Sequence, residues 1–315
     1  MLDLVIIGAA AAGCSAAVYA ARRNLNFVVI SKDIGGEVAL SGEVENWPGQ
    51  IHTTGIQLAQ DFHKHALSYD VKFEQGLEVI QIIQEKNYHI VVTKDYGGTE
   101  KKFETKTVLI GSGIHPRFIG VPGEMELKGR GVTYCTVCDG PLYKKKITTT
   151  VGAGNSGLES ALMMSTIAEK VYLLTKFSNT PETKGGFPKG ENILIEKVKQ
   201  LPNVEIIYNA KTVAILGEKS VTGIRYHDTV TNEEKEIETH GVMVHVGMIP
   251  NSGFATQLSK TPAGEIIIDK IGQTSIPGIF AAGDVTDIPY KQISIAAGQG
   301  VTAVLSAIDY LNRWE

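Results

Sequence analysis

Two cysteines, Cys135 and Cys138, are separated by two residues and followed at once by Asp139. Thiols at this spacing can close into a disulfide and reopen, which exchanges two electrons, and the setting lowers the thiol pKa toward the reactive thiolate. Asp139 can move a proton to or from one sulfur, or cap a helix N-terminus. Half of a structural zinc site is the alternative, but the chain has no second Cys-x-x-Cys, and its third cysteine is Cys14. The pattern therefore favours redox catalysis, with no metal expected.

Two glycine-rich turns flank the redox pair in the sequence. Residues 8–13 read Gly-Ala-Ala-Ala-Ala-Gly and residues 152–157 read Gly-Ala-Gly-Asn-Ser-Gly, each between an apolar run and a predicted helix. Such a turn holds the pyrophosphate of a dinucleotide on a helix N-terminus. The second turn matches the G-x-G-x-x-G fingerprint in full, whereas Ala10 replaces a glycine at which backbone approaches phosphate. Because both modules have the same internal spacing, they form a repeat that predicts two dinucleotide-binding units.

Hydroxyl and acidic residues end the predicted strands. The second strand of each module ends at Ser31 or Thr175, where a carboxylate commonly holds a ribose. A hydroxyl binds a ribose more weakly than a carboxylate does. The apolar run 278–283 ends in Asp284, which can hold ribityl or ribose hydroxyls, and Gln292 opens the predicted final helix. With the first glycine turn, these residues favour FAD as the ligand of the first module.

The composition is that of a globular protein. The chain has 315 residues, 43% of them hydrophobic and 20% charged, which suits about two domains. The net charge of −4 gives no reason to expect nucleic acid or an anionic membrane as a partner. Three cysteines are too few for a disulfide scaffold, so a reducing, cytoplasmic location is expected. The uncharged run 4–21 contains Gly8 and Gly13 and has no basic residue before it, which argues against export.

Proline and glycine residues mark two domain boundaries, the first near Pro116 and the second near Pro250. After the second boundary the chain returns to the pattern of the first domain. We therefore predict an α/β fold with two nested Rossmann-like domains, each with three layers of the ββα type. Residues 1–115 plus 248–315 are expected to form one discontinuous domain, and residues 116–247 the other.

Together these motifs resemble the low-molecular-weight thioredoxin reductases over essentially the whole chain. The resemblance rests on both glycine turns and on residues 43–49, 135–140 and 278–284. It implies a homodimer that binds FAD in the discontinuous domain and carries the redox disulfide in the inserted, nicotinamide-binding domain. Electrons would pass from nicotinamide to flavin to disulfide as the inserted domain rotates. It also implies that Cys138 faces the flavin, that Cys135 attacks the thioredoxin disulfide, and that Asp139 exchanges the proton.

The resemblance also implies cofactor contacts in both domains. The residues expected to contact FAD lie at turns and strand ends of the discontinuous domain: Gly8, Ala12, Gly13, Ser31, Gly36, Glu37, Asn46, Val79, Gly111, Gly283, Asp284, Gln292 and Ile293. The residues expected to contact a nicotinamide dinucleotide surround the second turn: Gly152, Gly154, Asn155, Ser156, Thr175 and Lys176.

The chain departs from the NADPH-dependent members after its second nucleotide-binding strand. Those members carry a His-Arg-Arg run there and another arginine downstream, whereas this chain has Thr175-Lys176-Phe177 and, downstream, Lys189. A 2′-phosphate is normally held by guanidinium groups, for which one lysine is a poorer substitute. One branch of the family lacks the nicotinamide motifs and is reduced by ferredoxin or by an unassigned donor. NADPH, NADH, ferredoxin and another carrier are therefore alternative donors, and tight packing around an empty second turn is the other interpretation.

The expected function is that of a cytoplasmic FAD-dependent oxidoreductase that reduces thioredoxin or a thioredoxin-like protein. A flavin-binding redox sensor without turnover, a function of a different class, has the same motifs. A flavoprotein subunit of a peroxide-reducing system would usually bring an extra thioredoxin-like domain. Because the chain starts directly at its first strand, that third class is not expected.

Several other features have a structural interpretation. Residues 144–146, three lysines, are expected to form a solvated strand edge, with docking of an acidic electron carrier as the alternative. Trp314 is expected to pack as a tail residue, or else to stack on the flavin. Residues 178–191 are predicted to form an exposed loop, and Cys14 to be a buried apolar residue. The histidines without ligand spacing are assigned structural roles: His63, His65, His240 and His245.

Overall fold

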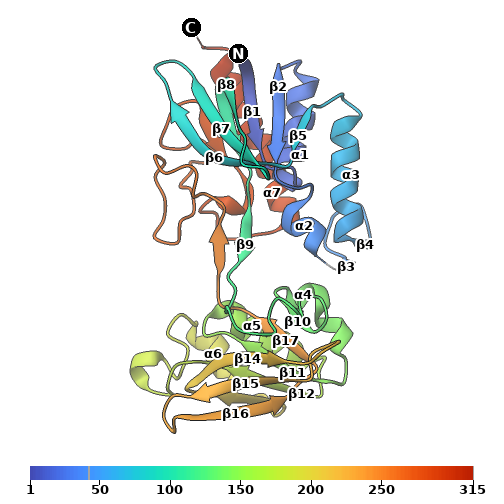
Figure 1. The fold of residues 1–315 in the computed structure, drawn as a ribbon, viewed down its shortest axis with the longest axis vertical. Coiled ribbons are helices and arrows are strands. Elements are labelled where there is room, and N and C mark those ends of the chain that lie inside the picture. Colours follow the sequence, from blue (N-terminus) through green and yellow to red (C-terminus); the bar gives the residue numbers. More distant parts are fainter. Residues whose placement is uncertain (42, 315) are drawn as a thin grey trace. The chain divides into compact units, whose positions relative to one another are not determined.

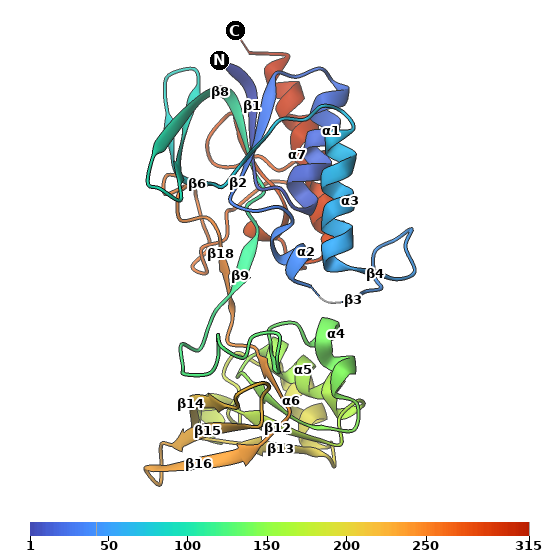
Figure 2. The same ribbon diagram turned by 45° about the vertical axis from the view of Figure 1, so that its right-hand side comes forward.

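Two units, each with its own sheet and hydrophobic cores, make up the chain (Figure 1, Figure 2). The computed structural model describes residues 1–41 and 43–314, without the side chains of Glu43 and Cys138. Unit 1 comprises Met1–His115 and Ile249–Glu315, and unit 2 comprises Pro116–Met248. At the unit boundaries, strand β9 (Ile114–Pro116) pairs with strand β18 (Met248–Pro250).

The sheet of unit 1 has the strand order β5-β2-β1-β8-β7-β6, with β19 beside β8. Its parallel part contains β1 (Leu2–Ile7), β2 (Phe27–Ser31), β5 (Phe73–Gln75), β19 (Ile279–Ala281) and the second half of β8 (Glu100–Ile110). Two antiparallel strands extend it, β6 (Leu77–Gln84) and β7 (His89–Asp95). The other elements are α1 (Ala11–Arg22), α2 (Gly36–Leu40), β3 (Glu43–Val44), β4 (Thr53–Thr54), α3 (Gly55–Leu67), η3 (Gly283–Val285) and α7 (Ile293–Leu311).

Strand β1 is buried on both faces because its side chains alternate between two cores. Leu4 and Ile6 pack in the core that contains residues of α1, α3 and α7. Val5 and Ile7 pack on the opposite face, in the core with residues of β6 and β7. Burial of consecutive apolar residues is typical of a strand covered on both faces.

Unit 2 repeats this plan with a parallel sheet in the order β10-β17-β11-β12-β13. Its strands are β10 (Val132–Thr133), β11 (Ile147–Val151), β12 (Lys170–Leu174), β13 (Val204–Ile207) and β17 (Gly241–Val244). A second, antiparallel sheet contains β14 (Ala210–Leu216), β15 (Gly223–Asp228) and β16 (Glu233–Glu238). The helical elements are α4 (Thr136–Asp139), η1 (Gly140–Tyr143), α5 (Asn155–Ser165), η2 (Pro181–Thr183) and α6 (Asn192–Lys199).

The parallel sheet of unit 2 lies between two cores. Leu173 of β12 packs with Leu158 of α5, in the core that also contains residues of α6. The next residue, Leu174, packs with Ile215 and Ile224 of the antiparallel sheet. Helices, parallel sheet and antiparallel sheet therefore form three layers, and the predicted α/β fold class is confirmed.

The segment 178–191 differs from the predicted exposed loop. The ring of Phe187 is fully buried in the core with Leu158 and Ile195. A single buried apolar residue among Gly, Pro and Lys residues gives no periodic pattern, so this packing cannot be predicted from the sequence.

Trp314 packs as a tail residue. Its indole Nε1 donates to the carbonyl oxygen of Asn87 at 3.0 Å, and the Lys106 ammonium lies 4.7 Å from the ring centroid. These contacts place Trp314 at the amino edge of the β1–β8 pair, opposite the carboxyl edge that carries Gly8. These contacts support the interpretation of Trp314 as a packed tail residue, and stacking on a flavin remains an untested alternative.

Other sequence expectations concern burial and solvent exposure. Cys14 is buried, and burial raises the pKa of its thiol to about 12, as expected for a structural cysteine. The three lysines at 144–146 are exposed. Among the described residues, no helix has both the length and the apolar character needed to span a bilayer.

Candidate functional site

The first glycine turn brings the carboxyl ends of β1, β2 and β8 together. Gly8 has a φ of +107°, which favours glycine, and its N–H donates to the carbonyl oxygen of Ile30 at 2.8 Å. Gly111 N–H donates to the carbonyl oxygen of Ile7, also at 2.8 Å. A Cβ on Gly13 would lie 1.8 Å from the carbonyl oxygen of Gly8. Helix α1 therefore begins in direct contact with the strand end, as a pyrophosphate cradle requires.

The N-terminus of α1 is suited to an anion despite Ala10. Ala10 is the N-cap residue, with φ −109° and ψ −157°, and no side chain among the described residues caps the helix there. An alanine adopts this extended backbone without strain. Its methyl carbon faces Gly36, where an added Cβ would lie 3.7 Å away. The first amides of α1 are thus left for a ligand, such as a phosphate group.

Two buried oxygen atoms beside this turn have no hydrogen-bond partner among the described residues: Ser31 Oγ at the end of β2 and Asp284 Oδ1 in η3. Burial raises the pKa of the Asp284 carboxyl, and the nearby Lys291 opposes that rise in part. A buried polar atom without a partner costs about 1–3 kcal/mol. Ligand hydroxyls would remove this cost, so the residues present fit the ribose and ribityl groups of FAD.

Three of the predicted FAD residues lie close together under the turn. The Cβ of Ala12 would be 3.4 Å from a Cβ added to Gly111 and 3.2 Å from one added to Gly283. Gly283 has a φ of +76°, and its N–H donates to Gln299 Oε1 at 2.8 Å. Segments that are far apart in the sequence therefore meet beside the N-terminus of α1.

The remaining predicted FAD residues occupy three other places. Asn46 Nδ2 donates to Gln292 Oε1 at 3.3 Å, which ties the first part of the chain to the N-cap of α7, just before Ile293. Gly36 and Glu37 begin the short helix α2. Val79 lies at a β-bulge of β6 and is buried in the core on the opposite face of the sheet. The structure thus brings Asn46 and Gln292 together, while Val79 packs on the other face.

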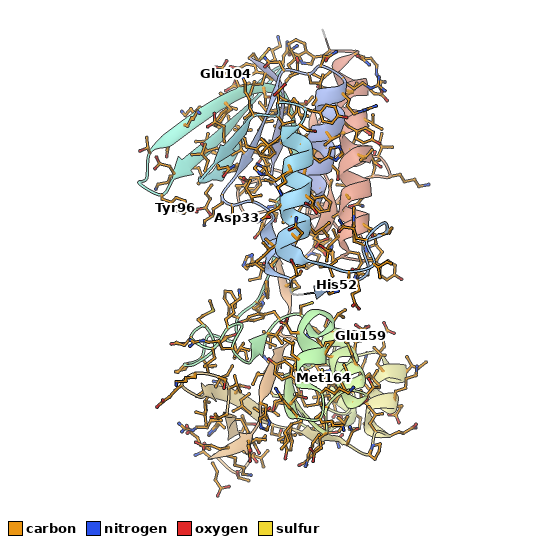
Figure 3. All side chains as sticks on the ribbon, turned by 90° about the vertical axis from the view of Figure 1, so that its right-hand side faces the viewer. Asp33, His52, Tyr96, Glu104, Glu159 and Met164 are labelled. Carbon is orange, nitrogen blue, oxygen red and sulfur yellow. The ribbon has the colours of Figure 1, made fainter. Side chains whose placement is uncertain are left out.

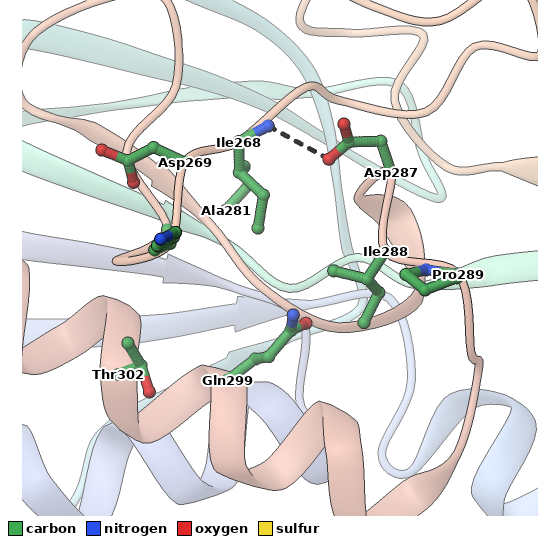
Figure 4. A pocket seen from close by; sticks show the side chains of 10 residues that line it. Ile268, Asp269, Ala281, Asp287, Ile288, Pro289, Gln299 and Thr302 are labelled. Atoms are coloured by element: carbon green, nitrogen blue, oxygen red, sulfur yellow. Dashed lines mark hydrogen bonds between the residues drawn. The ribbon is translucent and has the colours of Figure 1, made fainter.

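Two cavities in unit 1 border the segments that carry Ser31 and Asp284. One, of about 460 Å³, has Lys32, Gly76 and Glu78 in its wall. The other, of about 320 Å³, is lined in part by Gln299, Asp287 and Ile288 and is drawn in Figure 4, where Asp287 accepts a hydrogen bond from the Ile268 N–H. Open space therefore borders both segments that hold an unpaired oxygen.

The second glycine turn keeps its cradle geometry. Gly152 N–H donates to the carbonyl oxygen of Leu174 at 3.1 Å, and a Cβ on Gly152 would lie 2.5 Å from the carbonyl oxygen of His245. Gly154 caps α5 in an extended conformation, and no side chain in the described part of the chain makes a capping hydrogen bond there. Ser156 is exposed in the first turn of α5. The backbone of a dinucleotide site is therefore present.

The side chains around the second turn form hydrogen bonds with the segment that follows β12. Thr175 Oγ1 donates to the carbonyl oxygen of Gly186 at 2.6 Å, and it accepts from Phe177 N–H at 3.3 Å. The Asn155 side chain exchanges two 2.8 Å hydrogen bonds with Glu191. Since the Thr175 hydroxyl already has partners on both sides, its predicted contact with a ribose has little support here.

Two lysines lie near the second turn. Lys189 forms an isolated β-bridge with Gly154. The ammonium of the exposed Lys176 lies 5.4 Å from the centroid of the Phe177 ring. Lys189 is therefore the cation whose backbone is paired with the glycine turn itself.

Cys138 lies on α4, a helix of one turn, and Cys135 directly precedes this helix. Cys135 is disulfide-bonded, while the Cys138 side chain lies outside the described residues. Thr133 Oγ1 accepts the Cys135 N–H at 3.1 Å and donates to the Asp139 carboxylate. Asp139 is the N-cap residue of η1, but its side chain makes no capping hydrogen bond there. The carboxylate is therefore held against the backbone of Cys135 through Thr133, and the capping role considered from the sequence is absent.

Some residues around the redox pair were not singled out from the sequence. Glu124 is buried, and its carboxylate accepts the backbone N–H groups of Ile119 and Gly120 and the Tyr134 hydroxyl at 2.9 Å. Burial and this carboxylate raise the pKa of Tyr134, the residue before Cys135. Thr133 and Glu124 lack any motif, so only their position in the fold reveals them.

The model of the pyridine nucleotide-disulphide oxidoreductase family matches residues 2–300 of this chain. The chain belongs to this family. Solved structures agree: the thioredoxin reductase of Streptococcus pyogenes superposes with a TM-score of 0.84 at 32% identity, covering 99% of both chains. A ferredoxin-flavin thioredoxin reductase of Clostridium acetobutylicum superposes with a TM-score of 0.52 at 27% identity, covering 99% of this chain and 98% of that one.

Curated relatives carry other names. A subunit of the alkyl hydroperoxide reductase of Pseudomonas putida is 39% identical over 316 aligned residues, which cover 99% of this chain and 58% of the relative. A protein of Bacillus subtilis named NADH dehydrogenase is 39% identical over 312 residues, which cover 99% and 59%. The chain thus spans less than two thirds of the length of these relatives.

Family membership makes the chain an oxidoreductase of the flavoprotein type, with FAD as its cofactor. The resemblance to low-molecular-weight thioredoxin reductases is confirmed. The similarity to alkyl hydroperoxide reductase subunits returns peroxide-reducing systems, which were not expected from the sequence, to the candidate functions.

Proposed function

We propose that this flavoprotein reduces the disulfide of thioredoxin or of a thioredoxin-like protein through Cys135 and Cys138. One observation carries the proposal: Cys135 is disulfide-bonded directly before a one-turn helix, and its backbone N–H is linked through Thr133 to the Asp139 carboxylate. A disulfide next to a fixed proton carrier suits thiol–disulfide exchange.

The chemistry of the pair balances as two successive exchanges. In the dithiol form, the Cys135 thiolate attacks one sulfur of the partner's disulfide, and the other partner sulfur leaves as a thiolate. The Cys138 thiolate then attacks Cys135, which releases the second partner thiolate and restores the disulfide. Two electrons and two protons thereby reach the partner, and Asp139 exchanges a proton with the pair. Val137 and Leu142, 69% and 67% exposed, provide apolar surface beside the pair for such a partner.

FAD, when bound, supplies two-electron transfer to the redox pair. The N-terminal amides of α1 would hold its pyrophosphate, because no side chain that the structure describes caps that helix. Ser31 and Asp284 would accept or donate hydrogen bonds to its hydroxyl groups, since each has an unpaired buried oxygen. The predicted residues around the first glycine turn thus fit the cofactor of the family.

Two kinds of electron donor, a nicotinamide dinucleotide and ferredoxin, are compatible with the proposed function. Gly152 and Gly154 retain the backbone of a nicotinamide site, and the name of the Bacillus subtilis relative favours NADH. The engaged hydroxyl of Thr175 and the likeness to the ferredoxin-flavin thioredoxin reductase of Clostridium acetobutylicum favour ferredoxin instead. Anaerobic stopped-flow bleaching of the flavin by NADH, NADPH and reduced ferredoxin, offered separately, decides among them.

A hydroperoxide-reducing system is the second candidate function, because the Pseudomonas putida relative is named as part of an alkyl hydroperoxide reductase. In that case the thioredoxin-like partner would pass its electrons to a peroxidase. Consumption of hydroperoxide in the presence of a thiol peroxidase, without reduction of free thioredoxin, would favour this candidate over the first.

Steady turnover of a thioredoxin disulfide tests the main proposal and excludes a redox sensor. Cys135→Ser should abolish this turnover, because no nucleophile remains for the partner's disulfide, while bleaching of the flavin by the donor persists. Cys14→Ser is the matched control, because Cys14 is a buried free thiol. Full thioredoxin turnover by the Cys135→Ser variant would refute the proposed mechanism.

A homodimer is also proposed from the family resemblance. Leu40 on α2, Ile56 on α3 and Ile51 between β3 and β4 are apolar residues of unit 1 that are 65%, 59% and 95% exposed. Such side chains are suited to burial against a second copy. Light scattering that gives the mass of one chain at micromolar concentration would contradict it.

A further inference from the structure

A row of hydrogen-bonded side chains lies against the redox helix α4. Thr136 Oγ1 is 2.7 Å from Ser160 Oγ and also 2.7 Å from His245 Nε2. Ser160 Oγ is in turn 3.2 Å from Thr150 Oγ1. Thr136, Thr150 and Ser160 are buried, and His245 is partly buried. We call these four residues the polar cluster.

The polar cluster joins four segments of unit 2. Its members lie on α4, on β11, on α5 and directly after β17. Helix α5 also contributes Leu158 and Met164 to a hydrophobic core of unit 2 (Met164 is labelled in Figure 3). Because a buried hydroxyl is costly without a partner, each member depends on the others for its hydrogen bonds. The cluster therefore fixes the position of α4 against the sheet and α5.

Helix α4 needs such support because it has only four residues. A single helical turn is not stable by itself. Near its N-terminus, Thr133 holds Cys135 N–H and the Asp139 carboxylate. On the buried side of α4, Thr136 makes side-chain hydrogen bonds to Ser160 and His245. Thr136 thus connects the redox segment to His245, which is 109 residues away in the sequence.

We infer that His245 is a positioning residue for the redox pair: through Thr136 it holds α4 in the conformation in which Cys135 is disulfide-bonded. This inference rests on the proposed role of Cys135 and Cys138 as a redox pair, and it adds a residue that no motif marks. Burial lowers the pKa of His245 to about 4, so the imidazole stays neutral near pH 7 and acts as a hydrogen-bond partner.

The disulfide form depends on α4 more than the dithiol form does, since two bonded sulfurs require a fixed backbone whereas two free thiols do not. Loss of the His245–Thr136 hydrogen bond should therefore favour the dithiol. Reduction by dithiothreitol converts the protein disulfide to two thiols, as two electrons and two protons pass from the reagent, which becomes its cyclic disulfide. We expect the equilibrium constant of this exchange to rise about three- to tenfold.

The experiment uses the full chain loaded with FAD, under anaerobic conditions. The protein is equilibrated at pH 7 with mixtures of reduced and oxidised dithiothreitol, then quenched with acid and alkylated. Mass spectrometry of the peptide that contains residues 135–138 gives the ratio of the dithiol form to the disulfide form. His245→Ala and Thr136→Val should shift the equilibrium by the same factor. His245→Gln, which keeps a hydrogen-bonding group at similar reach, should restore the wild-type value. The double variant should show no further shift beyond either single variant.

His240→Ala is the matched control, since His240 is an exposed histidine just before β17. A wild-type equilibrium in both His245→Ala and Thr136→Val would overturn the inference. Additive shifts in the double variant would overturn it as well, because His245 would then not act through Thr136. If His245→Ala does not fold, Thr136→Val and His245→Gln decide by the same criteria. A failure of the proposed function is detected by a different measurement, because the Cys135→Ser variant would then still reduce thioredoxin.

Discussion

Single residues decide how the first glycine turn can hold a cofactor. Ser31 Oγ and Asp284 Oδ1 are buried without a hydrogen-bond partner in the described part of the chain. Folding leaves this desolvation cost in place, so these atoms favour a ligand that brings hydroxyl groups. Burial also raises the pKa of Asp284, as expected for a carboxyl that lacks hydrogen bonds to its charged form.

Asp284→Ala should weaken FAD binding about ten- to a hundredfold, the loss expected for one hydrogen bond to a charged group. The unfolding free energy of the FAD-free chain should not fall, because the variant removes a buried polar atom without a partner. Titration of the FAD-free protein with FAD, followed by flavin fluorescence, measures the affinity. Asp309→Asn, an exposed carboxylate on α7, is the control. Equal FAD affinity in Asp284→Ala and wild type would contradict the assignment.

His245 should make the stability of the chain depend on pH. Its pKa in the folded state is about 4, below the ordinary value of 6.5, so the unfolded state binds more protons between these values. Stability is therefore full above about pH 6.5 and is lost as the pH falls toward 4, by up to about 3 kcal/mol. Urea unfolding of wild type and His245→Gln across this range measures the unfolding free energy of each protein. The wild type should lose stability relative to His245→Gln as the pH falls. Parallel stability curves would rule out this titration.

At the scale of elements, the contact between α1 and α7 positions the first glycine turn. A Cβ on Gly300 would lie 2.1 Å from the carbonyl oxygen of Ala12, a backbone atom that cannot move aside alone. Ala12 belongs to the first turn of α1, so the packing of α7 sets where the anion-binding amides point. Gly298, two residues earlier in α7, has no atom of the described chain within 4 Å of such a Cβ.

These two glycines give a matched pair of substitutions. Gly300→Ala should destabilise the chain by about 1–3 kcal/mol, because the added methyl group pushes α7 away from α1. Gly298→Ala should leave stability unchanged or raise it by up to about 1 kcal/mol, since alanine favours a helix. Thermal unfolding of both FAD-free variants checks the contrast. Equal melting temperatures would mean that the two helices do not pack as described.

At the scale of the whole molecule, each unit has its own cores. Residues of unit 2 form two hydrophobic clusters, one on each face of its parallel sheet. Its ends lie next to each other, since Arg117 N–H donates to the carbonyl oxygen of Gly247 at 2.9 Å. Neighbouring ends and a complete core are the usual properties of a domain that folds by itself.

A fragment of residues 116–248 should therefore fold alone and unfold in one cooperative transition. It should keep its disulfide at Cys135 but bind no FAD, because the first glycine turn belongs to unit 1. Urea titration followed by circular dichroism, with FAD binding tested by ultrafiltration, checks both properties. A gradual, non-cooperative loss of signal would show that unit 2 needs the rest of the chain.

The sequence by itself determined the two glycine turns, the Cys-x-x-Cys pair and the α/β class, because each depends on local spacing or on the apolar runs that a strand–turn–helix unit requires. The tertiary structure decided which side chains meet. Gly283, the residue before Asp284, packs against Ala12 of α1 and Ala296 of α7, and the Thr175 hydroxyl donates to the carbonyl oxygen of Gly186. His245 reaches Thr136 across 109 residues, although its position in the sequence suggested no role. Such contacts depend on how distant segments pack, and no local pattern encodes that packing.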